Sequence, residues 1–286
     1  MQSHLVAWRQ SDQARQLAAL LGNARRSVLM LDYDGTLAPF EEERLRAVPY
    51  PGVAERLAHL ARLPHVRLAL VSGRPAGELR RMLAPEDGDF GRGFEIWGSH
   101  GWERITADGA YHLEPLGKEQ RLALQGLRQR LEAHGLSRAI ECKPASVAIH
   151  WRGADAARAG AIRALALSLY AGLAPVEGLE LLPFNGGLEL RSTVRTKGTV
   201  VDLILAGESP GIPAAYLGDD LTDEDAFQAL GDRGFSILVG QGPRPSAAQF
   251  WLRPPEELVD FLDAWAGGRP AQDSGSQWSG AAVDLP

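Results

Sequence analysis

The feature that most constrains the fold is an apolar run near the N-terminus that ends abruptly in acidic residues. Residues 28–31 read Val-Leu-Met-Leu, and positions 32–36 then read Asp-Tyr-Asp-Gly-Thr. Four consecutive apolar residues bounded by turn-forming residues are typical of a strand that is covered on both faces. Strands of this kind occur in parallel sheets that carry helices on either side, so the run predicts an α/β fold.

An alternation of strand and helix patterns extends this prediction along the chain. Apolar residues at helical spacing predict a leading helix near residues 8–26. Further strands are expected over 65–75 and 94–105, with helices over 53–64 and 76–84, and the same rhythm resumes late in the chain over 197–207, 214–220, 222–230 and 235–240. Alternating strands and helices favour a parallel, Rossmann-like sheet with right-handed crossovers.

A segment of different character interrupts this rhythm after Gly109. It contains helical patterns over 118–135 and 158–172, strand patterns over 139–153, and a hairpin-like pair over 178–192. We therefore expect a discontinuous core of residues 1–109 and 192–266, with an inserted α+β domain of residues 110–191. Residues 267–286 are rich in Gly, Ser and Ala and lack periodicity, so they are expected to form a flexible tail.

Composition narrows the class of protein and its partners. The 286 residues have a formal net charge of -6 and no block of Lys and Arg, which argues against a nucleic-acid surface. Cys142 is the single cysteine, so an internal disulfide is impossible. The N-terminus lacks the apolar segment of a signal peptide, and no apolar stretch is long enough to span a bilayer. We expect a cytoplasmic monomer without membrane or nucleic-acid partners.

The acidic pair after the first strand is the strongest candidate for chemistry. Residues two apart on an extended backbone project to the same side, so the carboxylates of Asp32 and Asp34 could face one ligand. Two close carboxylates repel each other unless a cation or a shared proton relieves them. Mg²⁺ prefers such hard oxygen ligands. Gly35 would let backbone N–H groups approach a ligand, and Thr36 adds a hydroxyl.

Three more strand or helix ends carry polar residues that a core does not need. Ser72, Gly73 and Arg74 combine a hydroxyl, backbone amides and a cation, although a Ser-Gly turn is also a common surface feature. Lys197 opens an expected helix, where the helix dipole disfavours a cation, so it either serves an anion or is an ordinary solvated lysine. Residues 218–225 contain five carboxylates. Helix capping by Thr222 and Asp225 would explain some of them but not the acids that directly follow the strand. Ligands bind at the carboxyl ends of strands in open α/β sheets, so these ends are expected to converge.

In this order, DYDGT, the SGR turn, an isolated lysine and GDDLTDEDAF resemble the four motifs of the haloacid-dehalogenase superfamily of phosphotransferases. More narrowly, LDYDGTLAPF, GSHGWE, ECKPASVAIHWR, LELR and YLGDDLTDEDAF are similar to the motifs of trehalose-6-phosphate phosphatases. The resemblance extends over roughly residues 27–238. It implies a parallel-sheet core with an inserted C2-type cap domain, and Mg²⁺-dependent hydrolysis of a sugar phosphate, trehalose 6-phosphate, through an aspartyl-phosphate.

The resemblance also implies roles for individual residues. Asp32 would attack phosphorus, and Asp34 would protonate the leaving sugar oxygen and then activate water. Ser72 and Lys197 would bind phosphoryl oxygens. The expected Mg²⁺ ligands are the Asp32 carboxylate, the Asp34 carbonyl and Asp219, with Asp220 and Asp223 supporting the ion or its waters. The residues expected to bind substrate are Gly35, Thr36, Gly73, Arg74, His100, Glu141, Lys143, Glu189 and Arg191.

The insert carries the sugar preference, and alternatives remain open there. Glu141, Lys143, Glu189 and Arg191 would bracket the sugar rings, or they could form ordinary cross-strand ion pairs. His100 could touch substrate or brace the hinge between core and cap. Ser192 stands where the family often has Pro, which weakens the assignment of the sugar. The alternatives are a phosphatase for sucrose 6-phosphate or mannosyl-3-phosphoglycerate, a phosphomutase and, more distantly, a signalling receiver domain.

Overall fold

The apolar run forms the central strand of the larger of two sheets. The structure is a computed structural model that describes residues 5–41, 46–83, 93–184 and 186–267. Strand β2 (Ser27–Leu31) lies between β11 (Ala214–Gly218) and β3 (Val66–Val71) and is parallel to both. All five of its residues are buried, because alternate side chains enter two different apolar clusters on the two faces of the sheet. This explains why the run is continuously apolar.

Within the described residues, the large sheet has nine strands in the order β1-β13-β12-β11-β2-β3-β4-β5-β6. Neighbours from β1 to β4 are parallel, and the last two pairings are antiparallel. The strands not yet given are β1 (Val6–Ala7), β4 (Phe94–Gly98), β5 (Glu103–Ile105), β6 (Tyr111–Leu113), β12 (Phe235–Val239) and β13 (Phe250–Leu252). The expected α/β class with a mostly parallel sheet is confirmed.

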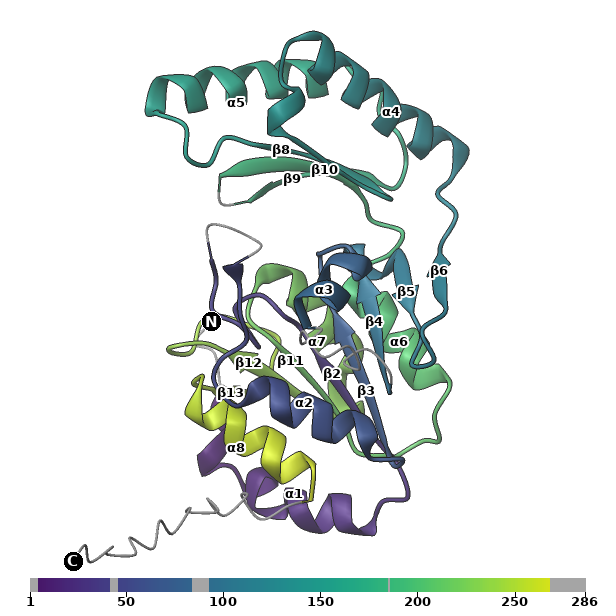
Figure 1. The fold of residues 1–286 in the computed structure, drawn as a ribbon, viewed down its shortest axis with the longest axis vertical. Coiled ribbons are helices and arrows are strands. Elements are labelled where there is room, and N and C mark those ends of the chain that lie inside the picture. The colour runs from purple at the N-terminus through teal and green to yellow at the C-terminus, as the bar shows by residue number, and fades with distance from the viewer. Residues whose placement is uncertain (1–4, 42–45, 84–92, 185, 268–286) are drawn as a thin grey trace, which may run out of the picture.

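Helices cover both faces of this sheet (Figure 1). One face carries α1 (Asp12–Asn23), α2 (Val53–Arg62), α3 (Ala76–Leu83) and α8 (Glu256–Trp265). The other carries α6 (Lys197–Ala206) and α7 (Glu224–Leu230). In the part of the chain that the structure describes, the short 3-10 helices with stated bounds are η1 (Trp8–Gln10), η3 (Ser99–Gly101), η4 (Ser137–Ala139), η5 (Leu221–Asp223) and η6 (Gly231–Arg233). The sheet is therefore the middle of three layers. Because helices cover both of its faces, a ligand can reach it at the ends of the strands.

The structure corrects the prediction of one strand over residues 94–105. The segment forms two antiparallel strands, β4 and β5, joined by η3. Ser99 and His100 have left-handed backbones with φ of 51° and 58°, and Gly101 follows with φ of 95°, so the chain reverses there. Strand β6 then pairs with β5, which places residues 111–113 in the large sheet although they were expected in the insert.

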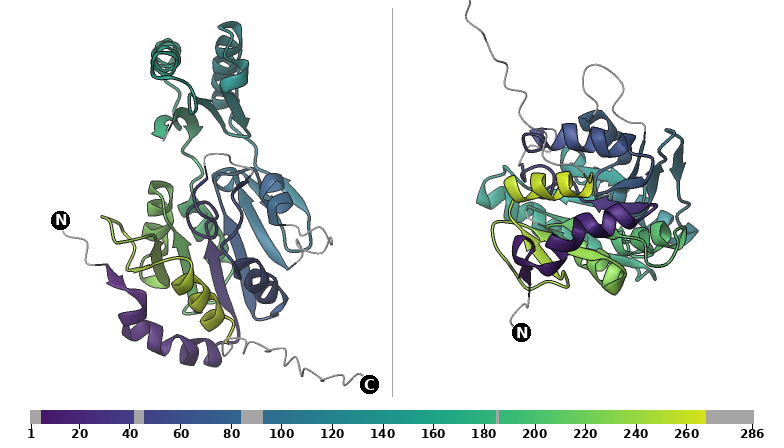
Figure 2. Two further views of the ribbon diagram at one scale, coloured as in Figure 1. Left: turned by 60° about the vertical axis from the view of Figure 1, so that its left-hand side comes forward. Right: turned by 90° about the horizontal axis from the view of Figure 1, so that it is seen from below.

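The remaining strands form a separate four-stranded antiparallel sheet in the order β7-β8-β10-β9. These are β7 (Ile140–Lys143), β8 (Ser146–His150), β9 (Leu179–Phe184) and β10 (Gly187–Ser192). Helices α4 (Lys118–Ala133) and α5 (Ala156–Ala171) pack on one face through a third apolar cluster. Figures 1 and 2 show this unit standing over the carboxyl ends of the large sheet, with its open face toward them.

Two expectations concern the ends of the chain and the membrane. The expected flexible tail, 267–286, lies outside the described residues except for Gly267. Within the described ranges, none of the helices combines the length and the apolar character needed to cross a bilayer.

Candidate active site

The site begins where three parallel strands end side by side. Leu31 in β2 is paired with Leu70 in β3 and with Leu217 in β11. The chain beyond each strand therefore emerges at one edge of the sheet, and the backbone N–H of Asp32 still donates to the carbonyl of Leu217 at 2.9 Å. This register brings together residues that are up to 187 positions apart in the sequence, which is the separation between Asp32 and Asp219.

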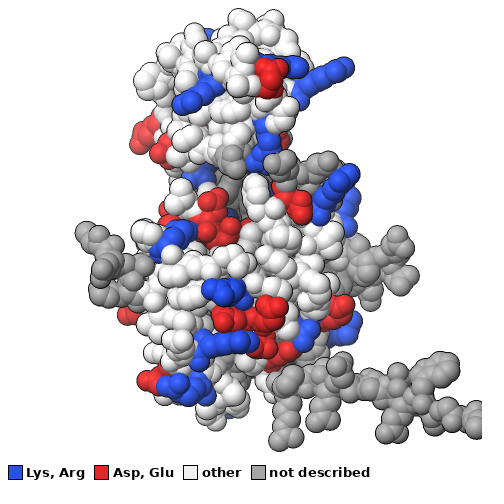
Figure 3. Space-filling view, turned by 90° about the vertical axis from the view of Figure 1, so that its left-hand side faces the viewer, with Lys and Arg blue, Asp and Glu red and all other residues white. Residues whose placement is uncertain are grey.

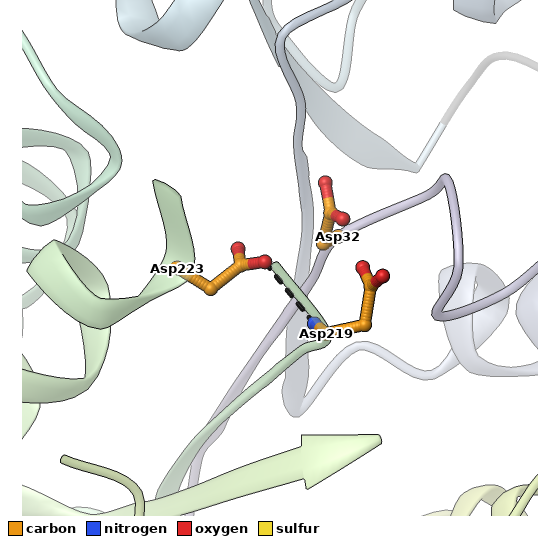
Figure 4. Close-up of side chains that lie close together, drawn as sticks. All are labelled: Asp32, Asp219 and Asp223. Atoms are coloured by element: carbon orange, nitrogen blue, oxygen red, sulfur yellow. Dashed lines mark hydrogen bonds between the residues drawn. The ribbon is translucent and has the colours of Figure 1, made fainter. Parts of the chain in front are cut away.

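Three carboxylates gather at this edge (Figure 4). Asp32 follows β2, Asp219 follows β11, and Asp223 ends η5; each offers an oxygen within 4.8 Å of the others. Carboxylate oxygens at this spacing are suited to a hard divalent cation. Figure 3 shows, on one face of the molecule, acidic side chains collected between the two units, with basic side chains close by.

Burial sets the electrostatics of this cluster. Loss of solvent raises the pKa of Asp32 well above its usual value, although the charge of Lys197 acts in the opposite direction. Burial, followed by the charge of Asp223, raises the pKa of Asp219 to about 7. Carboxylates this close together repel each other when they are charged, and a bound cation would offset that repulsion. The acidic cluster can therefore hold a metal ion.

Lys197 is the buried cation of the site. Its side chain is only 3% exposed, and its Nζ lies 2.8 Å from Asp32 Oδ1 and 2.7 Å from Asp223 Oδ1. Burial alone would lower the pKa of this lysine, but the carboxylates of Asp223 and Asp32 raise it above the ordinary value. The position is fixed because Lys197 is the first residue of α6, directly after the capping residue Thr196, whose Oγ1 accepts from two backbone N–H groups.

Asp223 organises the loop around it. Its Oδ1 accepts from Lys197 Nζ and, at 2.6 Å, from the Tyr216 hydroxyl, while Oδ2 accepts from the backbone N–H groups of Asp219 and Asp220 at 3.1 and 3.0 Å. The expected cap of Thr222 and Asp225 is wrong: Asp220 and Asp223 form the capping box, because the first turn begins at Leu221. Asp220 is exposed, and its carboxylate accepts a hydrogen bond from the backbone N–H of Leu221.

Asp34 does not join the carboxylate cluster. Both of its oxygens accept from the Arg74 guanidinium at 2.6 Å, and Arg74 also donates to Glu78 at 2.6 Å. The expectation that both acids of the first motif face one ligand is therefore not what the structure shows. Arg74 is 4% exposed, and its guanidinium donates to Asp34 and Glu78. The contact that the structure gives this residue, which was expected to bind substrate, is therefore with Asp34.

Gly35 and Thr36 contact Asp219. Gly35 has φ of 77°, and a Cβ built on it would lie 2.0 Å from Asp219 Oδ2, so only glycine fits there. The Thr36 hydroxyl is 3.3 Å from Asp219 Oδ1. Both residues therefore restrict where the Asp219 carboxylate can lie. Their expected contact with substrate stays a prediction.

Next to the carboxylates, the chain that follows β3 packs against His100, and this contact involves Ser72 and Gly73. Ser72 is buried, its Oγ accepts from the N–H of Arg74 at 3.2 Å, and its carbonyl accepts from the N–H of His100. The His100 ring lies 2.8 Å from where a Cβ of Gly73 would be, so this glycine makes room for the ring. Burial lowers the pKa of His100 well below its usual value, and the positive charges of Lys143, Arg191 and Lys197 lower it further. The ring is therefore neutral.

The open face of the four-stranded sheet contributes the expected residues of the insert. Ala148 in β8 pairs with Glu141 in β7 and with Glu189 in β10, so the two glutamates lie in one row across the sheet. Ser146 pairs in the same way with Lys143 and Arg191. Lys143 Nζ lies 3.1 Å from Glu189 Oε1, and the Ser146 hydroxyl donates to the same oxygen at 2.6 Å. His100, Lys143 and Arg191 all line a small cavity of about 10 Å³ between the two units.

Sequence reasoning missed several residues of this site. Ser146 and His150 alternate along β8 on the same face as Glu141, and His150 Nε2 lies 3.0 Å from Glu141 Oε2. The alternation in SVAIH could have identified both. The Tyr216 hydroxyl gave no such signal, because a tyrosine in an apolar strand normally indicates packing.

Comparison with known proteins places these features in a family context. The family model described as Trehalose-phosphatase matches residues 30–255. A trehalose-phosphate phosphatase of Mycobacterium tuberculosis is 32% identical over 265 residues, which cover 85% of this chain and 62% of that protein. The chain thus spans about three fifths of the length of the mycobacterial trehalose-phosphate phosphatases it matches.

Solved structures share the fold. The C-terminal domain of the C. albicans trehalose-6-phosphate phosphatase superposes with a TM-score of 0.73 at 19% identity, covering 94% of this chain and 100% of that one. A haloacid dehalogenase-like hydrolase from Bacteroides thetaiotaomicron gives a TM-score of 0.56 at 17% identity, covering 83% and 98%. At these identities the likeness concerns the fold alone.

Proposed function

The chain belongs to the trehalose-phosphatase family, and we propose that it acts by the chemistry of the haloacid-dehalogenase superfamily and hydrolyses trehalose 6-phosphate to trehalose and inorganic phosphate. The observation that carries the proposal is the buried contact of Lys197 with Asp32 and Asp223, beside Asp219, at the carboxyl edge of the sheet. A carboxylate next to a buried ammonium group and further acids is the arrangement that attack on a phosphoryl group requires.

Asp32 is the nucleophile of this proposal. One of its carboxylate oxygens forms a bond to phosphorus while the bond from phosphorus to the sugar oxygen breaks, which gives an aspartyl-phosphate and free sugar. Lys197 Nζ lies 2.8 Å from Asp32 Oδ1, and Ser72 follows β3, the strand that pairs with β2. Both would bind phosphoryl oxygens and stabilise the charge that develops on them. Water then attacks phosphorus, which releases phosphate and restores the Asp32 carboxylate.

Asp34 handles the proton in both steps. The leaving sugar oxygen takes a proton from the Asp34 carboxyl, and the attacking water later returns one. Both oxygens of Asp34 are occupied by Arg74 in the arrangement described above, so one of these contacts must give way before Asp34 can reach the sugar oxygen. Arg74 thereby holds Asp34 at the site and is not itself a substrate ligand.

Mg²⁺ is the cofactor of the proposal, and the donor set fits it. Oxygen ligands alone make up the cluster, and burial raises the pKa values of Asp32 and Asp219, so a bound cation would stabilise their charged forms. Asp32, Asp219 and the Asp34 carbonyl would hold the ion, while Asp223 and Asp220 support it through the loop. When bound, Mg²⁺ would supply positive charge that stabilises the phosphoryl oxygens.

The sugar is bound between the two units. The nine-stranded sheet with its helices forms the catalytic core, broadly the expected residues 1–109 and 192–266 together with β6, and the four-stranded unit acts as a cap that excludes water. The charged residues on the open face of the cap would hydrogen-bond to sugar hydroxyls; they are Glu141, Lys143, Glu189 and Arg191. His100 lines the small cavity between the two units together with Lys143 and Arg191, where it would contact the substrate.

A panel of sugar phosphates tests the proposal. Phosphate release is measured from trehalose 6-phosphate, sucrose 6-phosphate and mannosyl-3-phosphoglycerate, with Mg²⁺ and with EDTA. We expect the highest kcat/KM for trehalose 6-phosphate and loss of turnover in EDTA. A preference for another compound contradicts the assigned sugar, full activity in EDTA contradicts the metal, and transfer of phosphate to a sugar instead of water indicates a phosphomutase.

A further inference from the structure

An arginine outside the four motifs contacts residues 218–225, here called the acidic loop. Arg244 lies in the segment between β12 and β13. Its Nη2 donates to the backbone carbonyls of Asp219 and Asp220, both at 3.0 Å, and its Nη1 lies 2.6 Å from Glu224 Oε1. One side chain therefore ties two carbonyls of the acidic loop to the first residue of α7.

Glu224 anchors the other side of this contact. Its Oε2 accepts from the N–H of Ala247 at 2.6 Å and from the Ser246 hydroxyl at 3.1 Å. The Glu224 side chain is 18% exposed and the Arg244 side chain 30%, so the pair is largely shielded from solvent. The segment 244–247 and the start of α7 are thus joined by a continuous set of charged hydrogen bonds, which hold a guanidinium in a fixed orientation.

The acidic loop is held from both sides as a result. Asp223 accepts from the N–H groups of Asp219 and Asp220, and Arg244 donates to the carbonyls of the same two residues. The carboxylate of Asp219 extends from this backbone into the cluster. A shift of the loop would move that carboxylate relative to Asp32, and a metal site depends on the relative placement of its ligands.

We propose that Arg244 is a positioning residue for the metal site: with Glu224, it fixes the backbone from which Asp219 reaches the ion. The inference rests on the proposed Mg²⁺-dependent function. Arginine suits the role because its planar fork contacts two carbonyls and a carboxylate at once, which the ammonium group of lysine cannot do in the same geometry. A partly exposed ion pair without this role would leave metal binding unchanged when removed.

The test compares Arg244→Met with Arg253→Met. Arg253 belongs to the same region, donates to the carbonyl of Gln241 and lies over the Trp251 ring, and among the described residues its side chain does not bond to residues 218–225. Mg²⁺ affinity is measured by calorimetric titration and by the rise in melting temperature with Mg²⁺. We expect Arg244→Met to bind Mg²⁺ about 10- to 100-fold more weakly, the range seen when residues that orient metal ligands are removed. Arg253→Met should match the wild type.

Kinetics and a conservative variant separate positioning from general destabilisation. Arg244→Met should need more Mg²⁺ for half-maximal phosphate release, while its KM for sugar phosphate at saturating Mg²⁺ stays near that of the wild type. Arg244→Lys should recover only part of the Mg²⁺ affinity. If Arg244→Met does not fold, Glu224→Gln takes its place, and its Mg²⁺ affinity should fall several-fold.

The outcomes distinguish this inference from the proposed function. A wild type that binds Mg²⁺ and releases phosphate, together with an Arg244→Met or Glu224→Gln variant of unchanged Mg²⁺ affinity, overturns the role of Arg244 and leaves the function standing. A wild type that neither binds Mg²⁺ nor releases phosphate overturns the proposed function, and the role of Arg244 falls with it.

Discussion

Replacement of Lys197 by Met tests the buried charge arrangement directly. The ammonium group is 2.8 Å from Asp32 and 2.7 Å from Asp223, and all three side chains are at most 5% exposed. Methionine keeps the length of the side chain and removes its charge, which leaves two carboxylates buried without their cation. Removal of one partner of a buried ion pair costs about 3–5 kcal/mol.

This cost converts into a thermal shift. A domain of this size loses about 2–4 °C in melting temperature per kcal/mol, so Lys197→Met should melt between about 6 and 20 °C below the wild type. The deficit should shrink as pH falls, because protonation neutralises the carboxylates left behind. The assay is calorimetric melting of both proteins in EDTA at several pH values.

Lys118→Met is the matched control. Lys118 is exposed and, like Lys197, is the first residue of its helix. Its replacement should change the free energy of unfolding by no more than about 0.5 kcal/mol. A Lys197→Met protein that melts as close to the wild type as Lys118→Met does would refute the buried ion-pair arrangement.

Three further predictions concern the acids, the arginine beside them and the cap. Folding raises the pKa of Asp219 from 3.8 to about 7, so the metal-free protein should lose stability as the pH rises between those values. Thermal melts in EDTA at several pH values measure this loss. The variant Asp219→Asn should show a flatter dependence of melting temperature on pH. Arg74→Lys should lower kcat with little change in KM, because Arg74 contacts Asp34; a raised KM with unchanged kcat would mean direct substrate binding. Glu189→Gln, which weakens the contact with Lys143, should raise KM for the sugar phosphate but leave hydrolysis of p-nitrophenyl phosphate intact, and equal losses on both substrates would contradict a role in sugar binding.

The strand ends were predictable because their signals are local. An apolar run that stops at acids indicates both a buried strand and a polar edge, and parallel strands share that edge. Asp32, Ser72 and Asp219 could therefore be placed at one edge from the sequence. Lys197 could be suspected because a cation at a helix start needs a reason, and the structure supplies it in two carboxylates.

What could not be predicted depends on side-chain directions and on contacts between distant segments. The spacing of Asp32 and Asp34 suggested a shared ligand, but the strand ends at Leu31, so the alternation of an extended backbone no longer applies. Asp34 turns to Arg74, 40 positions away. Arg244 likewise meets the acidic loop only through the return of the chain after β12, and no local pattern marks it.

The central claim is that Asp32 attacks phosphorus, and phosphate release by Asp32→Asn tests it most directly. The amide cannot act as the nucleophile, yet it leaves the size of the side chain unchanged. With trehalose 6-phosphate and saturating Mg²⁺, the proposal predicts a loss of kcat/KM on the order of a thousandfold or more, with a melting profile that still shows a folded protein. An Asp32→Asn protein that releases phosphate at nearly the wild-type rate would contradict the mechanism.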